Sequence, residues 1–533
     1  MTPDQDDTLA RCRQAVAARP HDAAAEFALG TALWPAGHRE EAIEHLSRAV
    51  ALDGSHIDAR NNLGNALLEL GRFDEAIAQY RAALALRPNA PELHYNLGNA
   101  LLTSERPAEA EPCYRAALAQ KADHAGAHNN LGNALRAQGR HEEAIAEYRA
   151  ALSLRPEFFG SLNNIGSALL ALHRPDEAMR YFQEALRARP DYAEASNNLG
   201  GALLALDQPE QALQWFRRAV QQDPGQVQAR FGEAMALLVM ENFRDGWAAY
   251  EARWLDPRFR EDTPDYPDQP WLGQPGVAGR TVYLHAEQGL GDTIQFVRYA
   301  PLLRQRGARV VLEVQSPLVP LMRDLADIVI VARDPVPAYD FRCPLLSLPL
   351  AFGTELATIP VQIPYLRTDP ARRAVWSERL GPRTRKRVGI AWSGAPDHPE
   401  DAIRSIPAVL FLPPLMAAGV ELHVIQKEIR DTDAAAIATA TGLTVHANHL
   451  RDFAETAALV SELDLVISVD TSVAHLAGAL GVPTWILLQF SSDFRWLRKR
   501  TDSPWYPTVR LFRQAERNAW PPVIAAVAAE LAP

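Results

Sequence analysis

Cysteine is scarce in this sequence, as are long apolar runs and a surplus of basic residues. The three cysteines, Cys12, Cys113 and Cys343, lie too far apart for a disulfide framework or a metal-ligand spacing, which suits a reducing cytoplasm. No apolar run reaches the ~18 residues of a membrane-spanning helix, and the acidic N-terminus is unlike a signal peptide. The net charge of −11 argues against a nucleic-acid partner. We therefore expect a cytoplasmic protein without membrane insertion and with small-molecule or protein partners.

The length and composition are those of a globular protein with several domains. A chain of 533 residues is too long for one ordinary hydrophobic core. Its hydrophobic content of 47% and charged content of 22% are ordinary for folded domains. A search for internal repeats is therefore the first step in dividing the chain.

Four registers recur every 34 residues in the first half. The glycines are Gly30, Gly64, Gly98, Gly132, Gly166 and Gly200, and the alanines are Ala42, Ala76, Ala110, Ala144, Ala178 and Ala212. The aromatics are Tyr80, Tyr114, Tyr148, Phe182, Phe216 and Tyr250, and the prolines are Pro88, Pro156, Pro190 and Pro224. Small residues let paired helices approach, the ring fills the space between them, and proline ends the second helix. The pattern resembles the tetratricopeptide repeat and predicts an α-solenoid over residues 1–255, with about seven units and a diverged last one.

A polar register accompanies the glycines. It consists of Asn62, Asn96, Asn130, Asn164 and Asn198, each two residues before a glycine. Because residues one period apart stack along a solenoid, these amides predict a ladder that donates to and accepts from an extended peptide backbone. The ladder resembles the peptide-binding asparagines of the O-GlcNAc transferase superhelix, which implies an acceptor protein in the repeat groove. The alternative is that the amides serve contacts between helices or with solvent.

A second asparagine register follows the glycines directly. Asn65, Asn99 and Asn133 would extend the ladder, but Ser167 and Gly201 interrupt this register. Self-association through the repeats stays open.

The second half has the pattern of parallel α/β sheets. Residues 256–279 are rich in proline and predict a connector. Short apolar segments then alternate with helical ones. The predicted strands lie within residues 281–288, 309–315, 328–333, 386–394, 421–428, 443–448, 463–470 and 484–490. We expect one Rossmann-like domain over 280–366, a connector over 367–385 and a second Rossmann-like domain over 386–533. Ligands of such sheets bind at the carboxyl ends of the strands. The organisation resembles the GT-B fold of glycosyltransferases.

The segment VDTSVAH, residues 469–475, follows a predicted strand and opens a helix. The helix N-terminus with the hydroxyls of Thr471 and Ser472 predicts a diphosphate site, and His475 lies on the same helix face. The alternative is that Asp470 or Thr471 caps the helix and that His475 packs inside. The segment resembles the VDTG-x-x-H motif of bacterial ADP-heptose:lipopolysaccharide heptosyltransferases, with Ser472 in place of the glycine. The resemblance implies that Asp470, Thr471 and His475 contact a nucleotide sugar.

Other strand ends supply further candidate donor contacts. Trp392, Ser393 and Gly394 offer a hydroxyl and bare backbone to a phosphate. A site without metal needs a cation for the leaving diphosphate, and Arg404 follows in the next segment. The pair Gln426 and Lys427 ends another strand and is a candidate for nucleotide contacts. A solvated arginine and a polar strand end are the alternatives.

One pattern is compatible with a metal. Asp431 and Asp433 form the DxD pattern that binds a metal and a sugar nucleotide in another glycosyltransferase fold. Here the pattern begins an alanine-rich run, so Asp433 is better explained as a helix cap. No other group of His, Cys or carboxylate residues has ligand spacing, so we expect no metal and no cofactor besides the nucleotide-sugar substrate.

The segment HAEQGLGDTIQF, residues 285–296, places a glycine-rich turn between a strand and a helix. The turn would face VDTSVAH across the cleft. Inverting sugar transfer needs a base for the acceptor hydroxyl. The turn resembles the G-x-x-GD turn of the heptosyltransferases, which implies that Asp292 is this base. A helix N-terminus stabilises a carboxylate and weakens it as a base, so His285 or Glu287 is an alternative base. A simple helix cap is the structural alternative for Asp292.

The joint pattern predicts an inverting, metal-independent glycosyltransferase that modifies a protein hydroxyl held by the repeats. The overall layout resembles O-GlcNAc transferase and the bacterial flagellin glycosyltransferases, which implies an acceptor such as flagellin. One alternative is a repeat scaffold with a degenerate GT-B half, and another is a transferase with a glycan or lipid acceptor. UDP-GlcNAc, an ADP-heptose and a CMP-nonulosonate all remain open as donors.

Overall fold

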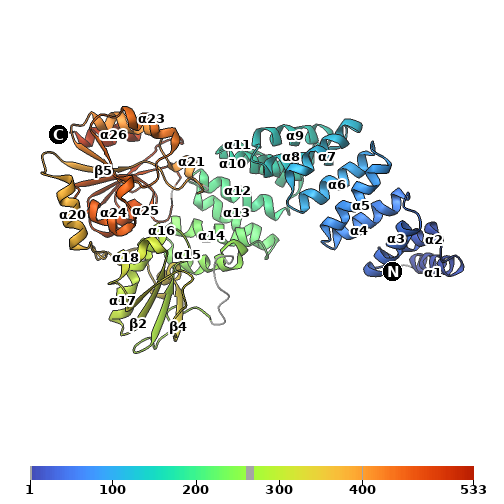
Figure 1. Cartoon of the computed structure of the whole chain (residues 1–533), viewed down its shortest axis with the longest axis horizontal. Coiled ribbons are helices and arrows are strands. Elements are labelled where there is room, and N and C mark those ends of the chain that lie inside the picture. Colours follow the sequence, from blue (N-terminus) through green and yellow to red (C-terminus); the bar gives the residue numbers. More distant parts are fainter. Residues whose placement is uncertain (1–2, 260–268, 399, 492, 533) are drawn as a thin grey trace. The chain divides into compact units, whose positions relative to one another are not determined.

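The computed structural model describes residues 3–259, 269–398, 400–491 and 493–532 (Figure 1). The chain divides into two compact units, Met1–Leu199 and Gly200–Pro533, and each is described by itself. The predicted connector 256–279 is only partly described, because residues 260–268 lie outside these ranges. Within the described ranges, no helix is long and apolar enough to cross a membrane.

The first unit consists of helices that pack in consecutive pairs, as the 34-residue period predicts. The helices are α1 (Pro3–Ala18), α2 (Ala23–Leu33), α3 (Arg39–Leu52), α4 (Ile57–Glu69), α5 (Phe73–Leu86), α6 (Pro91–Thr103), α7 (Pro107–Gln120), α8 (Ala125–Ala137), α9 (His141–Leu154), α10 (Phe159–Ala171), α11 (Pro175–Ala188) and the start of α12 (Ala193–Ala205). The helical solenoid is thus confirmed.

The glycine and aromatic registers meet inside each helix pair. A Cβ atom on Gly132 would lie 2.5 Å from Cε1 of Tyr148, and one on Gly166 would lie 2.5 Å from Cε1 of Phe182. The rings are fully buried, so they fill the volume that a side chain at the glycine would take. The period therefore encodes a packing contact between the two helices of a unit.

The interrupted asparagine register has a structural reason. The hydroxyls of Tyr80, Tyr114 and Tyr148 donate to the side-chain oxygens of Asn65, Asn99 and Asn133 at 2.6, 2.9 and 2.8 Å. Where the ring is Phe182 or Phe216, no hydroxyl needs an acceptor, and the position holds Ser167 or Gly201. Asparagine and tyrosine therefore occur together because a buried hydroxyl needs a partner.

The second unit begins with the last repeat helices and continues into two parallel sheets. Its repeat part consists of the rest of α12, α13 (Pro209–Gln222), α14 (Val227–Val239) and α15 (Phe243–Tyr250), followed by the 3-10 turns η1 (Glu251–Leu255) and η2 (Pro257–Phe259). The first sheet has the order β3-β2-β1-β4 and the second the order β10-β9-β8-β5-β6-β7. The order of the second sheet is that of the doubly wound Rossmann sheet.

The elements of the first sheet region are β1 (Thr281–His285), α16 (Leu290–Phe296), α17 (Ala300–Gln305), β2 (Arg309–Val314), α18 (Val319–Met322), β3 (Ile328–Val331), β4 (Phe341–Pro344) and α19 (Leu348–Ala351). Those of the second are α20 (Pro370–Leu380), β5 (Arg387–Ala391), α21 (Asp401–Arg404), α22 (Ala408–Met416), β6 (Glu421–Val424), α23 (Ala434–Thr439), β7 (Leu443–Val445), α24 (Phe453–Val460), β8 (Leu465–Val469), α25 (Ser472–Ala479), β9 (Thr484–Leu488), β10 (Val509–Arg513) and α26 (Trp520–Leu531). The sequence predicts every strand except β4 and β10.

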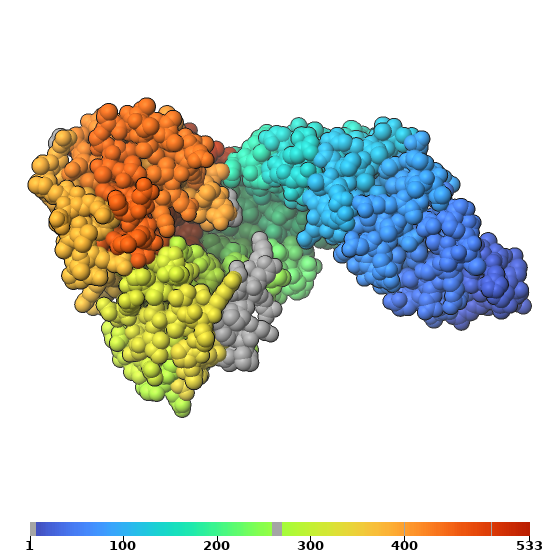
Figure 2. All heavy atoms as spheres, viewed as in Figure 1, coloured from blue at the N-terminus to red at the C-terminus, as the bar shows by residue number. Residues whose placement is uncertain are grey.

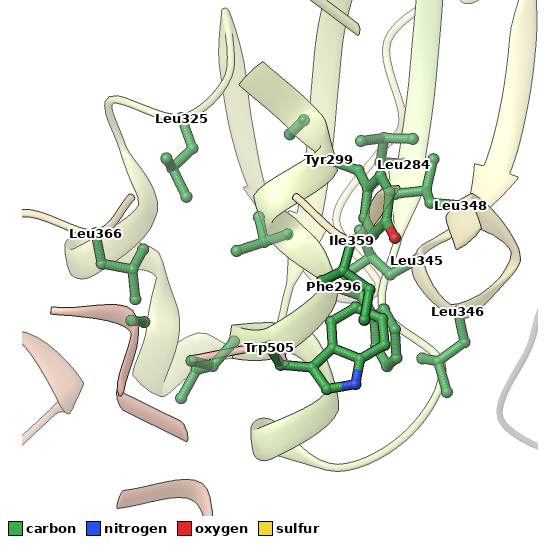
Figure 3. Packing of buried hydrophobic residues seen from close by; sticks show 14 of the residues in the cluster. Leu284, Phe296, Tyr299, Leu325, Leu345, Leu346, Leu348, Ile359, Leu366 and Trp505 are labelled. Carbon is green, nitrogen blue, oxygen red and sulfur yellow. The ribbon is translucent and has the colours of Figure 1, made fainter. Parts of the chain in front are cut away.

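One hydrophobic core joins the last repeat, the first sheet and part of the second sheet region. Trp247 of α15 contacts Phe296 edge-on, with ring centroids 5.9 Å apart. Trp505, from the segment before β10, packs on Phe296 with ring centroids 5.7 Å apart, and Figure 3 shows both residues in the buried cluster that includes Leu345 and Leu346. Because these rings share one core, the last repeat is part of the fold that carries the sheets.

Ion pairs strengthen the same junction. Arg253 of η1 is fully buried and donates to both carboxylate oxygens of Glu287, at 2.9 and 3.0 Å. Arg498 donates to Asp207, between α12 and α13, and to Glu210 in the first turn of α13. The last repeats are therefore bonded to residues of both sheet regions.

Candidate functional site

A pocket of about 990 Å³ opens at the carboxyl ends of the second sheet. The strand order reverses between β5 and β8, which is the place where doubly wound sheets bind ligands. The segments after these two strands, Ser393–Ala395 and Asp470–Val473, both line the pocket. Figure 2 shows the yellow-green residues of the first sheet region meeting the orange residues of the second, and α16 and α25 pack against each other at this border.

The glycine-rich turn and VDTSVAH face each other, as the sequence predicts. Helix α16 packs on α25, and a Cβ atom on Gly291 would lie 3.0 Å from Cδ2 of His475 and 3.6 Å from Cα of Ser472. The absent side chain thus allows the two helix starts to approach. Gly289 holds the N-cap position of α16, and Asp292 lies in the first turn. Asp292 is therefore not the helix cap.

Asp292 is held by an arginine from the other sheet region. Arg495 donates to Oδ1 of Asp292 from Nε at 3.1 Å and also from Nη2. Its Nη1 donates to both oxygens of Asp493 at 3.1 and 3.0 Å. Burial lowers the pKa of Arg495, and the charges of Asp292 and Asp493 raise it. The net result is a pKa well above the usual value of an arginine. All three side chains line the pocket.

The other two candidate bases lie outside the pocket lining. His285 is 2% exposed at the end of β1, and burial lowers its pKa to about 3, assisted by the charges of Arg342 and Arg253. Glu287 is bound by Arg253 and also accepts from the backbone N–H of Leu346 at 3.0 Å. Burial opposes ionisation of both partners and raises the pKa of Glu287, but the charges of Glu287 and Glu251 give Arg253 a net upward shift in pKa. Of the three candidates, Asp292 alone borders the pocket.

The start of α25 brings the predicted donor residues together. Asp470, Thr471, Ser472 and His475 all line the pocket, and Thr471 holds the N-cap position. Burial raises the pKa of Asp470 to about 6, and the charge of Asp493 adds to the shift. Burial lowers the pKa of His475 well below its usual value, so the ring is neutral near pH 7. Its Nδ1 lies 3.0 Å from the hydroxyl of Tyr506. A neutral imidazole supplies hydrogen bonds and no charge.

The predicted donor contacts near the end of β5 fall into two groups, one that lines the pocket and one that does not. Ser393, Gly394, Arg404, Gln426 and Lys427 line the pocket. The Arg404 guanidinium lies over Gly394, where a Cβ atom would stand 2.5 Å from Nη2. Gln426 fixes the strand ends, since its side chain accepts from the backbone N–H of Trp392 and donates to Ser393.

The structure does not bring Trp392 to the pocket lining. Its ring is fully buried, and its Nε1 donates to Asp433 at 2.9 Å. Asp433 also accepts from the backbone N–H of Ala408, so it caps α22 and makes no capping bond to α23. Both residues hold elements together in the interior. Among the described residues, no group of three or more His, Cys, Asp or Glu side chains has the geometry of a metal site.

The asparagine ladder forms, and its N–H groups are engaged inside the solenoid. Each ladder residue is half-buried and donates to a residue of the preceding repeat. The bonds run from Asn62 to Thr31, from Asn96 to Asn61, from Asn130 to Asn99, from Asn164 to Asn133 and from Asn198 to Asn163. The alternative interpretation, contacts between helices, therefore describes what these amides do in the structure.

The sequence motifs do not identify two groups of residues that line the pocket. The first is Arg495 with Asp493, in a segment after β9 that has no recognisable spacing. The second, here called the repeat wall, consists of Phe231, Met235, Tyr250 and Phe259 from the last repeat and η2. Tyr250 belongs to the aromatic register, but its hydroxyl accepts from Gln288 of the glycine-rich turn at 3.0 Å. This contact shows that the last repeat forms part of the pocket.

Known families match both halves of the chain. Residues 64–104 match the TPR repeat family, and residues 95–157 and 163–227 match the tetratricopeptide repeat family. Residues 432–520, which include VDTSVAH and Arg495, match glycosyltransferase family 9 (heptosyltransferase).

Individual proteins are similar to parts of this chain. Protein FlbA of Caulobacter vibrioides is 30% identical over 336 residues, which cover 57% of this chain and 54% of FlbA. The chain therefore spans about half the length of this relative. Among solved structures, YrrB, described as a TPR protein with an unusual peptide-binding site, is 23% identical, with a TM-score of 0.32 over 34% of this chain and 95% of YrrB. PilF of Pseudomonas aeruginosa is 27% identical, with a TM-score of 0.34 over 38% and 92%. From the family matches, the chain has the layout of tetratricopeptide repeats fused to a glycosyltransferase family 9 region.

Proposed function

We propose that this protein is an inverting, metal-independent glycosyltransferase with a GT-B pair of domains, 280–366 on the acceptor side and 386–533 on the donor side. It acts in the cytoplasm and transfers a sugar from a nucleotide sugar to a Ser or Thr hydroxyl of a protein. The observation that carries the proposal is the pocket in which Asp292 of the first sheet region faces the start of α25 in the second.

The donor side suits a diphosphate. The first N–H groups of α25 are unpaired within the helix and attract an anion, and the hydroxyls of Thr471 and Ser472 stand beside them. Arg404, Lys427 and Arg495 add positive charge around the same pocket. Charge that develops on the leaving diphosphate is then met by groups already in place, which lowers the barrier without a metal.

The acceptor side suits a carboxylate base. The acceptor oxygen loses its proton to a carboxylate oxygen of Asp292 and forms a bond to the anomeric carbon. The bond from that carbon to the diphosphate oxygen breaks, and its electron pair leaves with the diphosphate. Attack from the face opposite the leaving group inverts the anomeric centre. Glu287 is less suited to this role because both its oxygens are held by Arg253.

The acceptor is proposed to arrive from the repeats. The repeat wall borders the same pocket as Asp292, so a chain lying along the last repeat reaches the base directly. This observation supports a protein acceptor, of which flagellin is one example, more strongly than the asparagine ladder does, since the ladder's N–H groups bond inside the solenoid. A glycan or lipid acceptor is the alternative, and its apolar part would contact the same wall.

The test has two stages. A thermal-shift panel of UDP, GDP, ADP and CMP nucleotides and sugars first identifies the donor. Release of nucleotide from that donor is then measured for the wild type, Asp292→Asn and His475→Ala, with Asp431→Asn as the control because Asp431 is exposed outside the pocket lining. We expect Asp292→Asn to lower turnover by roughly 10²- to 10⁴-fold, the range for loss of a general base. Unchanged turnover in both pocket variants contradicts the proposed site.

A further inference from the structure

Arg495 joins the two sides of the pocket through ionic bonds. It belongs to the segment after β9, yet two of its nitrogens donate to Asp292 of α16, 203 positions earlier in the chain. Its third nitrogen donates to Asp493. The side chains of Arg495 and Asp292 are 15% and 16% exposed, so both retain a face toward the pocket. In this structure the proposed base is therefore engaged by a cation.

The same cation stands at the proposed diphosphate site. Gly291, the neighbour of Asp292, approaches Ser472 and His475 at the start of α25. The charge of Arg495 also influences the pKa values of Asp470 and His475, which belong to that segment. A diphosphate on the α25 N-terminus would thus arrive beside the guanidinium.

We propose that Arg495 is a ligand of the donor diphosphate and that it leaves Asp292 to bind it, so that the carboxylate is free for the acceptor only while a donor is bound. This inference rests on the proposed function and deepens it. Arg495 is a donor-binding residue, and its bond to Asp292 keeps the base occupied in the empty enzyme.

The exchange follows from charge and geometry. A guanidinium presents five N–H groups in a planar fork that fits both carboxylate and phosphate oxygens. A diphosphate carries more negative charge than one carboxylate, so it attracts the shared cation more strongly. Asp493 holds Nη1 throughout, so the guanidinium can pivot on that bond.

The inference predicts an unusual sign for a substitution at the base. If Asp292 and the diphosphate compete for Arg495, removing the charge of Asp292 strengthens diphosphate binding. If Arg495 only braces the two sheet regions together, removing Asp292 loosens the pocket and weakens binding or leaves it unchanged. The two accounts therefore differ in the direction of the change.

The experiment is isothermal titration of the full-length chain with inorganic pyrophosphate and with ADP, GDP and UDP. The variants are Asp292→Asn, Arg495→Gln and their combination, with Arg495→Lys as a milder version that keeps the charge and loses the fork. We expect about tenfold tighter binding for Asp292→Asn, equivalent to ~1.4 kcal/mol. We expect at least tenfold weaker binding for Arg495→Gln, an intermediate loss for Arg495→Lys, and no gain from Asp292→Asn in the Arg495→Gln background.

A matched control separates exchange from simple repulsion. Glu400→Gln removes another carboxylate from the pocket lining, one that accepts from Gln489 instead of Arg495, so binding should change less than about twofold. Equal or weaker binding by Asp292→Asn overturns the inference and leaves the proposed function standing, as does tightening that persists without Arg495. Binding of none of the four probes to any variant overturns the inference, and the proposed function falls with it if CMP nucleotides and sugars also fail to bind.

Discussion

The polar side chains of the repeats and those of the sheet regions are used differently. In the repeats, polar residues recur with the 34-residue period and bond to one another: Arg72 with Glu75, Arg106 with Glu109, Arg140 with Glu143 and Arg174 with Glu177. In the sheet regions, Asp292, Asp470 and Arg495 occur once each and converge on one pocket. Polar residues that recur with the period thus hold the repeats together, because the same contact serves every unit. Polar residues that occur once form the pocket, because a reaction takes place at one site.

Glu287 is an exception to this difference, because it occurs once and yet serves the fold. Its substitution should have the largest effect on stability. The residue lies outside the pocket lining and neutralises the fully buried Arg253. Glu287→Ala should lower the free energy of unfolding by about 3 kcal/mol, since it leaves a buried guanidinium short of a partner. Chemical denaturation of the full-length chain measures this. A loss below 1 kcal/mol would mean that Glu251 and Ser347 suffice for Arg253.

Two neighbouring glycines in α12 test whether recurrence signals packing. A Cβ atom on Gly200 would lie 2.7 Å from Cε1 of Phe216, whereas one on Gly201 meets nothing within 4 Å. Gly200→Ala should destabilise by roughly 1–3 kcal/mol through overpacking. Gly201→Ala should stabilise by about 0.5–1 kcal/mol because alanine favours a helix interior. Melting temperatures that move in the same direction for both would contradict the packing account.

Asp470 should give a pH-dependent effect. Its pKa is raised to about 6 from the usual 3.8, so the folded protein holds this proton more tightly than the unfolded chain. Stability from this group is therefore lost as pH rises from about 4 to about 6. Asp470→Asn should be more stable than the wild type above pH 6 by roughly 1–2 kcal/mol, and equal to it near pH 4. Melting curves at several pH values check this, and an identical profile for the two proteins would refute it.

The pairing of tyrosine with asparagine should give the smallest effect. Asn133→Ser leaves the buried hydroxyl of Tyr148 without its acceptor and should cost ~1 kcal/mol or more. Adding Tyr148→Phe recreates the combination found at Ser167 and Phe182 and should recover part of that loss. A double-mutant cycle on the free energy of unfolding measures the coupling, and strict additivity would argue against the pairing.

The repeats could be predicted from sequence almost completely, because the residues that form each contact recur in several units of the chain. The strands β1 and β5 are equally clear as apolar runs. The strands β4 and β10 are not predicted, because FRCP and VRLFR carry arginines, which a sequence pattern assigns to the surface.

The site could be predicted where strand ends define it and not where distant segments meet. Asp470 and Asp292 follow from their turns, but Arg495 lies 203 positions from Asp292 in a segment without a motif. Trp392 follows a strand as a ligand contact would, yet its ring turns into the core to bond Asp433. The sequence orders residues along a strand, and the packing on each side of the sheet decides which way they point.

The most direct test is a crystal structure of the full-length chain with the nucleoside diphosphate that binds best. The account predicts the diphosphate on the first N–H groups of α25, with the Arg495 guanidinium turned from Asp292 toward it. A diphosphate bound elsewhere on the protein would contradict the account.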